Sequence, residues 1–345
     1  MATTMGFKLP PVRYNEKGAL RTAGFELEYS NLSVEESARL VQQLYGGQVQ
    51  KENRFKHKVK GTALGDFTVE FDLQLLTEKK YKSVFEALHI KVEDVKMGSA
   101  TLEDEVEEKL GSLISKVFPN EIACPPVPIT ELEKLEKLRE ALYQHHAQGT
   151  QAFLTNAFGT HINAEVPATD TQTLLTYLRA FLLLYPWLLQ KGHTDLARKV
   201  SPFINAYPAD YTELVLQPAY TPTLREMVQD YHAYNPDRNR PLDFYPLFAA
   251  LDEEALRPYS NLGKVKARKT FHYRLPNSSV AQPGWTLAEE WNNWVTIEEL
   301  AHDSEKVARL SQEYLQLKRD TLVGFEGRWA KRTEQWLHHG DTSIK

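Results

Sequence analysis

Cysteine is nearly absent from this chain, because Cys124 is the only one among 345 residues. An intrachain disulfide is therefore excluded, which fits a reducing compartment. No long apolar segment follows Met1, so we expect no secretory signal. No run of eighteen apolar residues occurs either. The most apolar stretch, residues 180–189, is short and contains Pro186, which predicts a buried helix and no membrane span. We therefore predict a cytoplasmic protein.

A strong excess of charge of either sign is also missing. The formal net charge is −5 and the isoelectric point is about 6.2. Such a balance gives no general attraction to nucleic acid or to anionic membranes, so neither is expected as a partner. The sequence has no internal repeat and no low-complexity linker. We predict a single domain over residues 1–345, with a mainly helical insertion at about 170–260. These features do not predict an oligomeric state.

Two carboxylates stand two residues apart in the stretch 22–30, which alternates as a strand does. Glu26 and Glu28 share one face, whereas Phe25, Leu27 and Tyr29 share the other and are expected in the core. Neighbouring carboxylates on a buried sheet repel each other and lose hydration. A divalent metal with oxygen ligands would compensate for this. The alternative is a solvated polar face with salt-bridge partners.

Residues 52–60 and 66–73 are predicted to form a hairpin around two glycines. Acidic residues of the second arm share a face, and lysines lie on the first arm. One interpretation is simple pairing of opposite charges between the two strands. The other is that Glu70 or Asp72 faces the same site as Glu26 and Glu28.

Three further strands carry polar faces. A short strand at residues 121–126 begins at Glu121 and is stopped by two prolines. The strand 156–167 places His161, Asn163 and Glu165 on one face. The most regular strand, 264–275, carries Lys266, Arg268, His272 and Arg274 on its polar face. A histidine on a strand is often only hydrogen-bonded structure, and a lysine-rich face can also mark a solvent-exposed edge.

Helical spacing of apolar residues and capping signals predict the helices. Capping boxes are expected at Ser33–Glu36 and Thr130–Glu133. A leucine stripe follows the second box, and Gly46 ends the helix that begins at the first. The other predicted helices cover residues 101–118, 171–191, 222–233, 243–256, 285–301 and 303–320.

A turn-like segment at residues 234–247 carries Arg238 and Arg240. Arginines on a surface turn often have no specific role. Two on a rigid turn can instead bind a substrate carboxylate or phosphate through paired hydrogen bonds.

Four polar strand faces thus need a common explanation: Glu26 with Glu28, Glu121, His161 with Asn163, and His272 with Arg274. Carboxylates, histidines and cations on successive strands suit a site for a metal-bound nucleotide. Metals there neutralise phosphate oxygens, and cationic side chains stabilise the transferring phosphoryl group.

The same segments carry a resemblance to a known family. Residues 24–29 (GFELEY) resemble the opening G-x-E-x-E motif of amidoligases, in the carboxylate–amine ligase superfamily that includes glutamine synthetase and glutamate–cysteine ligase. Residues 121–126 (EIACPP) are similar to its E-x-x-S-P-P segment, and 159–163 (GTHIN) to its G-x-H-x-H/N strand. Residues 271–276 (FHYRLP) are similar to a late x-E-x-R strand, and 237–243 is a weaker match to an Arg-Asn segment. Cys124 replaces a common serine. His272 replaces a metal-binding glutamate, which leaves the number of metals open.

The resemblance implies an α+β fold with a curved antiparallel sheet of the glutamine synthetase type. Its concave face would be polar, and helices would pack on the outer face. The cofactors implied are ATP and Mg²⁺, with Mn²⁺ as an alternative metal. The metal ligands would be Glu26, Glu28, Glu121, His161 and His272; Glu26, Glu28 and Arg274 would be catalytic; Lys266, Arg268 and Arg274 would contact phosphate; and Asp72, Asn163, Arg238 and Arg240 would contact substrate.

The function implied is an ATP-dependent ligase that forms an amide or isopeptide bond through an acyl phosphate. Its partners would be a carboxylate, on an amino acid or peptide, and an amine donor. Two alternatives stay open. One is a nucleotide- or metal-binding protein of the same fold with altered catalysis, suggested by His272. The other is a metal-dependent hydrolase built on the same cluster.

Overall fold

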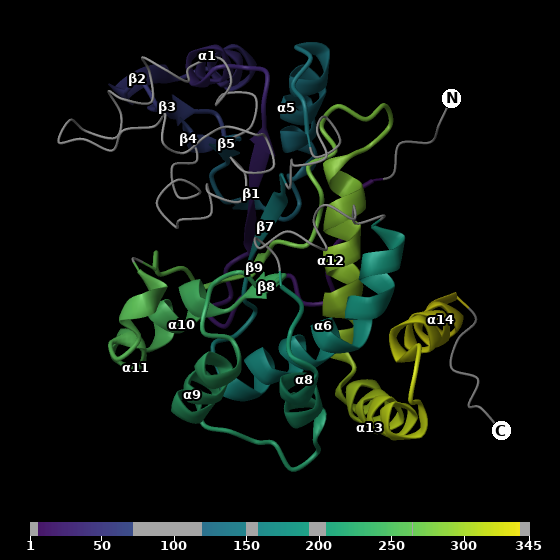
Figure 1. The fold of residues 1–345 in the computed structure, drawn as a ribbon. Coiled ribbons are helices and arrows are strands. Elements are labelled where there is room, and N and C mark those ends of the chain that lie inside the picture. The colour runs from purple at the N-terminus through teal and green to yellow at the C-terminus, as the bar shows by residue number, and fades with distance from the viewer. Residues whose placement is uncertain (1–5, 72–118, 150–157, 193–204, 264, 339–345) are drawn as a thin grey trace, which may run out of the picture.

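One large antiparallel sheet forms the centre of the molecule. The computed structural model describes residues 6–71, 119–149, 158–192, 205–263 and 265–338. Within these residues the sheet has nine strands in the order β2-β3-β4-β5-β1-β7-β9-β8, with β6 also paired to β1 (Figure 1). The order has two free ends, so the sheet is open. The strands are β1 (Thr22–Tyr29), β2 (Gln48–Asn53), β3 (Lys56–Thr62), β4 (Gly65–Phe71), β5 (Asn120–Ala123), β6 (Val127–Pro128), β7 (Thr160–Glu165), β8 (Leu242–Asp243) and β9 (Thr270–Tyr273).

The central strand β1 has the alternation that its sequence predicts. Phe25, Leu27 and Tyr29 are fully buried in the apolar core, and Glu26 and Glu28 lie on the opposite face. On one side β1 pairs with β5 and then with β6, and the chain between these two strands passes close to Gly24. A Cβ atom at Gly24 would lie 3.3 Å from the carbonyl oxygen of Cys124. Glycine is therefore favoured at this close approach of two backbones.

Helices cover the apolar face of the sheet. In α6 (Thr171–Lys191), Tyr177 stacks on Phe271 of β9 with ring centroids 4.6 Å apart. In α12 (Leu287–His302), Trp294 contacts both Phe271 and Tyr273. The fold is therefore a mixture of helices and one large antiparallel sheet, as expected. The glutamine synthetase type of sheet stays a prediction.

The remaining helices confirm most of the predicted positions. The capping box at Ser33 and Glu36 forms at the start of α1. The predicted box at Thr130 is wrong: residues 129–132 lie in a turn after β6, and α5 begins at Glu133 without a side-chain cap. The sequence did not indicate α8 or α14, and the predicted helix 101–118 lies outside the described residues. The helices not yet given are α1 (Val34–Tyr45), α5 (Glu133–Gln144), α8 (Ala209–Leu216), α9 (Leu224–Tyr234), α10 (Tyr245–Leu251), α11 (Glu253–Leu256), α13 (Ser304–Asp320) and α14 (Phe325–His338), with a 3₁₀ turn at Ser260–Leu262.

The predicted strand 264–275 is shorter than expected, because only Thr270–Tyr273 pair as β9. Its neighbour β7 runs into Pro167, which has no amide hydrogen to continue the ladder. Before β9 the chain turns toward α10 instead, and the amide of Arg268 donates to the carbonyl of Pro246 at 2.8 Å. Lys266 and Arg268 therefore lie before β9, outside the strand that carries His272.

A buried ion pair joins the start of β1 to α12. Arg21 binds Glu298 through two hydrogen bonds of 2.7 and 2.8 Å, and both side chains are almost fully buried. Tyr177 and Trp294 also donate to Glu298. Both charged groups, Arg21 and Glu298, are therefore hydrogen-bonded, which offsets the cost of burying them.

The long apolar helix α6 continues through Pro186 and lies in the protein core. Across the part of the chain that the structure describes, no helix combines the length and apolar character needed to cross a membrane.

Candidate metal centre

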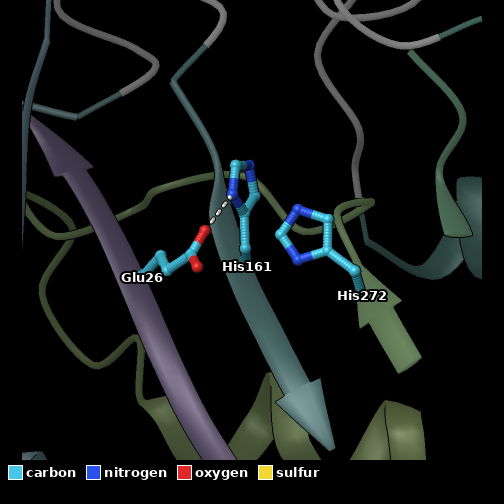
Figure 2. A group of neighbouring side chains, drawn as sticks. All are labelled: Glu26, His161 and His272. Atoms are coloured by element: carbon cyan, nitrogen blue, oxygen red, sulfur yellow. Dashed lines mark hydrogen bonds and ion pairs between the residues drawn. The ribbon is translucent and has the colours of Figure 1, made fainter. Parts of the chain in front are cut away.

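The polar face of the sheet gathers side chains from four neighbouring strands. Glu26 of β1 lies directly opposite His161 of β7, and Glu28 of β1 lies opposite Glu121 of β5. Asn163 of β7 lies opposite His272 of β9. Directly opposed residues share a face and are close enough to touch. Figure 2 shows Glu26, His161 and His272 rising side by side from β1, β7 and β9.

Glu26 is buried and accepts three hydrogen bonds. His161 Nδ1 lies 3.1 Å from its Oε2, and Asn163 Nδ2 lies 3.0 Å from its Oε1. Arg268 Nη1 also reaches Oε1, at 2.7 Å. Burial alone would raise the pKa of this carboxyl, but the hydrogen bond from His161 and the electrostatic contributions of His272, His161 and Arg268 hold the pKa well below its usual range. Glu26 is therefore ionised at neutral pH.

Glu28 is oriented by the backbone just before the neighbouring strand β7. Its Oε2 accepts the amide hydrogen of Gly159 at 2.6 Å, and its Oε1 lies 3.5 Å from Nε2 of His161. His161 thus has one ring nitrogen on Glu26 and the other facing Glu28. Because 3.5 Å is long for a hydrogen bond, this nitrogen and this oxygen are placed side by side but only weakly joined.

His272 lies beside His161, with ring centroids 5.2 Å apart and the rings edge to face. Its Nδ1 lies 2.9 Å from Oδ1 of Asn163. Burial is the main reason why the pKa of His272 falls well below its usual value; Glu26 opposes the shift, whereas His161, Arg274 and Arg268 add to it. His272 is therefore a neutral imidazole near pH 7.

These groups have the composition of a divalent-metal site. Two sets of three side chains each place one ligand atom within 4.8 Å of the others: Glu28, Glu121 and His161, and Glu26, His161 and His272. The first set offers two carboxylates and one imidazole, which suit Mg²⁺ or Mn²⁺. The second offers one carboxylate and two imidazoles, a softer set that favours Mn²⁺ or Zn²⁺ over Mg²⁺. The donor chemistry therefore fits a metal, and the two sets share His161.

Of the three cationic residues predicted to contact phosphate, two lie near the cluster and one does not. Arg268 reaches the cluster through Glu26, and it also donates to Oδ1 of Asn163 at 3.1 Å. Arg274 directly follows β9, and its charge adds to the lowering of the pKa of His272. Lys266 is exposed and lies in the segment before β9, outside the strand that was expected to carry it.

The two arginines of the segment 234–247 do not act as a pair. Arg240 is buried and its Nε donates to Oδ1 of Asn235 at 2.7 Å, so it supports the fold locally. Arg238 is partly exposed, and its Nε donates to Asp243 at 3.2 Å. Its carbonyl oxygen accepts a 2.6 Å hydrogen bond from Arg274. Arg238 is therefore held next to Arg274, whereas Arg240 is bound to Asn235.

Glu165 and Glu70, which were predicted on the polar faces of two different strands, have other partners. Glu165 accepts hydrogen bonds from Asn15 and Thr22, so it holds the segment that leads into β1. Glu70 lies opposite Glu121 and pairs with Lys56 at 2.6 Å. The cross-strand charge pairing expected for the hairpin is thus present at Glu70. Asp72 lies outside the described residues.

Sequence reasoning did not single out Asp243. This fully buried carboxylate lies opposite His272, on the two-residue strand β8. Burial raises its pKa, against the opposing charges of Arg238 and Arg274. A strand of two residues shows no alternation, so only its position between Pro241 and Pro246 could have marked it.

A comparison with known families identifies the family of the chain. Residues 20–296 match the family model described as "putative amidoligase enzyme". The match covers most of the chain and includes every strand that contributes to the cluster. No curated protein matches the chain.

Proposed function

The chain belongs to the amidoligase family, and from this premise we propose that it joins a carboxylate to an amine at the expense of ATP. The observation that carries the proposal is the group formed by Glu28, Glu121 and His161, whose ligand atoms lie within 4.8 Å of one another. Phosphoryl transfer depends mainly on positioning and charge stabilisation by metals and cations. A face that binds metals and is bordered by arginines would supply both the positioning and the charge stabilisation.

Glu28, Glu121 and His161 would hold the first divalent metal, and His272 would contribute to a second. A metal held there would spread the negative charge of the phosphate oxygens. Glu28 is suited to this role because Gly159 already fixes one of its oxygens and leaves the other directed at His161.

The proposed reaction has two steps. A substrate carboxylate attacks the γ-phosphorus of ATP, which forms an acyl phosphate and releases ADP. An amine then attacks the acyl carbon, phosphate leaves, and the amine gives up one proton. Arg274 directly follows β9 and would stabilise the charge on the transferring phosphoryl group.

Arg238 is the better candidate for binding the substrate carboxylate. Its Nε is held by the buried Asp243, and the side chain is 29% exposed, so its outer nitrogens can meet a ligand. Guanidinium groups recognise carboxylates through paired hydrogen bonds. Arg240 is buried against Asn235 and is not proposed for this role. An amino acid or a peptide is the expected substrate class.

The test measures phosphate release from ATP by the full chain, with Mg²⁺ or Mn²⁺, across panels of carboxylates and amines. Phosphate release that requires a carboxylate and an amine supports the ligase. Metal-dependent cleavage of an amide without ATP would support a hydrolase instead. MgATP should also raise the melting temperature, because a ligand of the native state stabilises it, and excess chelator should abolish the shift. Binding without turnover on any substrate pair would point to a protein with altered catalysis.

A further inference from the structure

The polar face of the sheet continues beyond the metal cluster to a buried carboxyl group. Asn163, His272 and Asp243 occupy directly opposed positions on β7, β9 and β8, and β8 is the last strand in the order of the described sheet (Figure 1). Directly opposed residues share a face, so Asp243 lies on the same face as His272, one strand spacing of about 5 Å further out. The side chain of Asp243 is completely buried there.

Both oxygens of Asp243 accept a hydrogen bond from an N–H group. Oδ1 accepts the backbone amide hydrogen of Tyr245 at 3.0 Å, and Oδ2 accepts the Nε hydrogen of Arg238 at 3.2 Å. The first bond fixes the carboxyl group to the first residue of α10. The second bond then fixes the side chain of Arg238 to the carboxyl group.

The backbone around Arg238 is held by hydrogen bonds from other segments. Nη1 of Arg274 donates to the carbonyl oxygen of Arg238 at 2.6 Å, and the amide of Arg274 donates to the carbonyl oxygen of Pro241 at 2.8 Å. The amide of Asn205 donates to the carbonyl oxygen of Asn239 at 2.6 Å. Arg238 is therefore restrained both along its backbone and at Nε.

The outer end of the Arg238 side chain can meet a ligand. A guanidinium group has five N–H donors, and Asp243 uses one of them. Among the residues that the structure describes, the other four have no hydrogen-bond partner, and the side chain is 29% exposed. The Nη1 and Nη2 end carries two parallel N–H groups, which match the two oxygens of a carboxylate.

We propose that Asp243 is a positioning residue, which holds Arg238 at the β8 end of the polar face so that Nη1 and Nη2 bind a carboxylate group of the substrate. An arginine side chain has many rotamers, and ordering such a side chain on binding weakens affinity about 2- to 10-fold. Asp243 reduces this cost because it orders Arg238 before the ligand arrives.

This inference rests on the proposed function, since a ligase of this kind needs a place for its carboxylate substrate. The test uses the full chain without ATP, metal or amine. Carboxylate binding without any ligase turnover and turnover without binding at Arg238 are therefore separate results.

The first measurement is the order of the Arg238 side chain, from ¹⁵N relaxation of its Nε–H signal, which Arg238→Lys identifies. In the wild type this group should be as ordered as the backbone. In Asp243→Asn it should become mobile, because an amide has one oxygen for two donors and the amide of Tyr245 is the closer donor. A mobile Arg238 Nε–H in the wild-type protein would overturn the proposal, and this result needs no buried substitution.

The second measurement is a titration with glutarate at constant ionic strength, followed by NMR shifts of Arg238 Nε–H and of the backbone amides in residues 235–243. The wild type should show saturable binding. Arg238→Lys should bind about 10- to 100-fold more weakly, because the paired hydrogen bonds to a charged group are lost. No saturable shift in the wild type, or tighter binding of inorganic phosphate than of glutarate, would overturn the carboxylate assignment.

The third measurement separates positioning from a purely structural role. Asp243→Asn should weaken glutarate binding about 2- to 10-fold in the wild type, but it should add no loss in the Arg238→Lys background, because its effect passes through Arg238. An additional loss of the same size in that background would contradict the proposal.

Asp252→Asn is the matched control. Asp252 also accepts a backbone amide hydrogen through Oδ1, from Ala255, and binds an arginine through Oδ2, but it lies between α10 and α11 and not on the sheet. Glutarate affinity and the order of Arg238 should be unchanged in this variant. Equal losses of glutarate affinity in Asp252→Asn and Asp243→Asn would show a general effect of losing a buried acceptor and would overturn the proposal.

Discussion

Glu28 and Glu121 are direct neighbours across β1 and β5, so two carboxylates rise from opposed positions on the same face of the sheet. Their mutual repulsion is unfavourable unless a cation lies between them or a proton neutralises one of them. His161 is the third member of this group and presents a ring nitrogen to it. The arrangement is therefore one that a divalent metal stabilises and that a metal-free protein tolerates at a cost.

Glu28→Gln should weaken Mn²⁺ binding by at least about 100-fold, more than is typical for loss of a supporting residue. The glutamine oxygen can still accept the amide hydrogen of Gly159, and one of two crowded charges is gone. The melting temperature of the metal-free protein should therefore stay the same or rise, as calorimetry with a chelator would show.

Glu70→Gln is the matched control, because Glu70 lies opposite Glu121 but pairs with Lys56. Partly exposed ion pairs contribute about 1 kcal/mol at most, so little stability should be lost. Mn²⁺ affinity should stay within about twofold of the wild type, since the substitution removes no metal ligand. A large loss of metal-free stability in Glu28→Gln, with unchanged Mn²⁺ affinity, would mean that the acidic pair is structural.

His272→Glu should shift the metal preference from Mn²⁺ toward Mg²⁺, because a carboxylate offers a charged, hard oxygen where imidazole offers a softer nitrogen. The variant should also lose about 0.5–1.5 kcal/mol of unfolding free energy, since Oδ1 of Asn163 loses its contact with His272 and keeps the hydrogen bond from Arg268. Titration of both metals gives the ratio of affinities. If neither His272→Glu nor His272→Ala changes that ratio, His272 lies outside the metal site.

Glu298→Gln should reduce the unfolding free energy by about 3–5 kcal/mol, because it leaves Arg21 buried without a matching charge. Urea denaturation would measure the loss. Glu254→Gln breaks an ion pair with Arg257 in which both side chains are exposed, and it should cost less than about 1 kcal/mol. Mn²⁺ affinity should be unchanged in both variants. A small loss in Glu298→Gln would show that this pair does not anchor β1 to α12.

Asp170→Ala should lower stability by about 1 kcal/mol at pH 7, because Asp170 caps the N-terminus of α6. Partial burial would raise the pKa of Asp170, but hydrogen bonds from Thr173 hold it below its usual value. A lowered pKa means that the stabilisation is present above the pKa of the unfolded chain and is lost as the pH falls through the folded value. The difference between variant and wild type should therefore shrink below about pH 4, as urea denaturation at pH 7 and pH 3 would show. A difference that does not change with pH would contradict this role.

The sequence alone predicted the features that depend on local periodicity. The strict alternation of residues 22–29 placed Phe25 and Leu27 in the core and the two glutamates on the other face. The capping box at Ser33 set the start of α1, and the apolar run of residues 171–191 set α6. The ordered motifs also indicated the family that the match over residues 20–296 confirms.

Only the tertiary structure decided which polar groups meet. The register between strands far apart in the sequence places Glu26 against His161 and Asn163 against His272. Register follows from backbone ladders and from packing of the opposite face, so no local pattern reveals it. For the same reason the sequence could not separate Arg268, which reaches Glu26, from Arg240, which is buried beside Asn235. The residue types of the cluster are known from the sequence alone. Their partners and the direction of each hydrogen bond depend on the folded sheet.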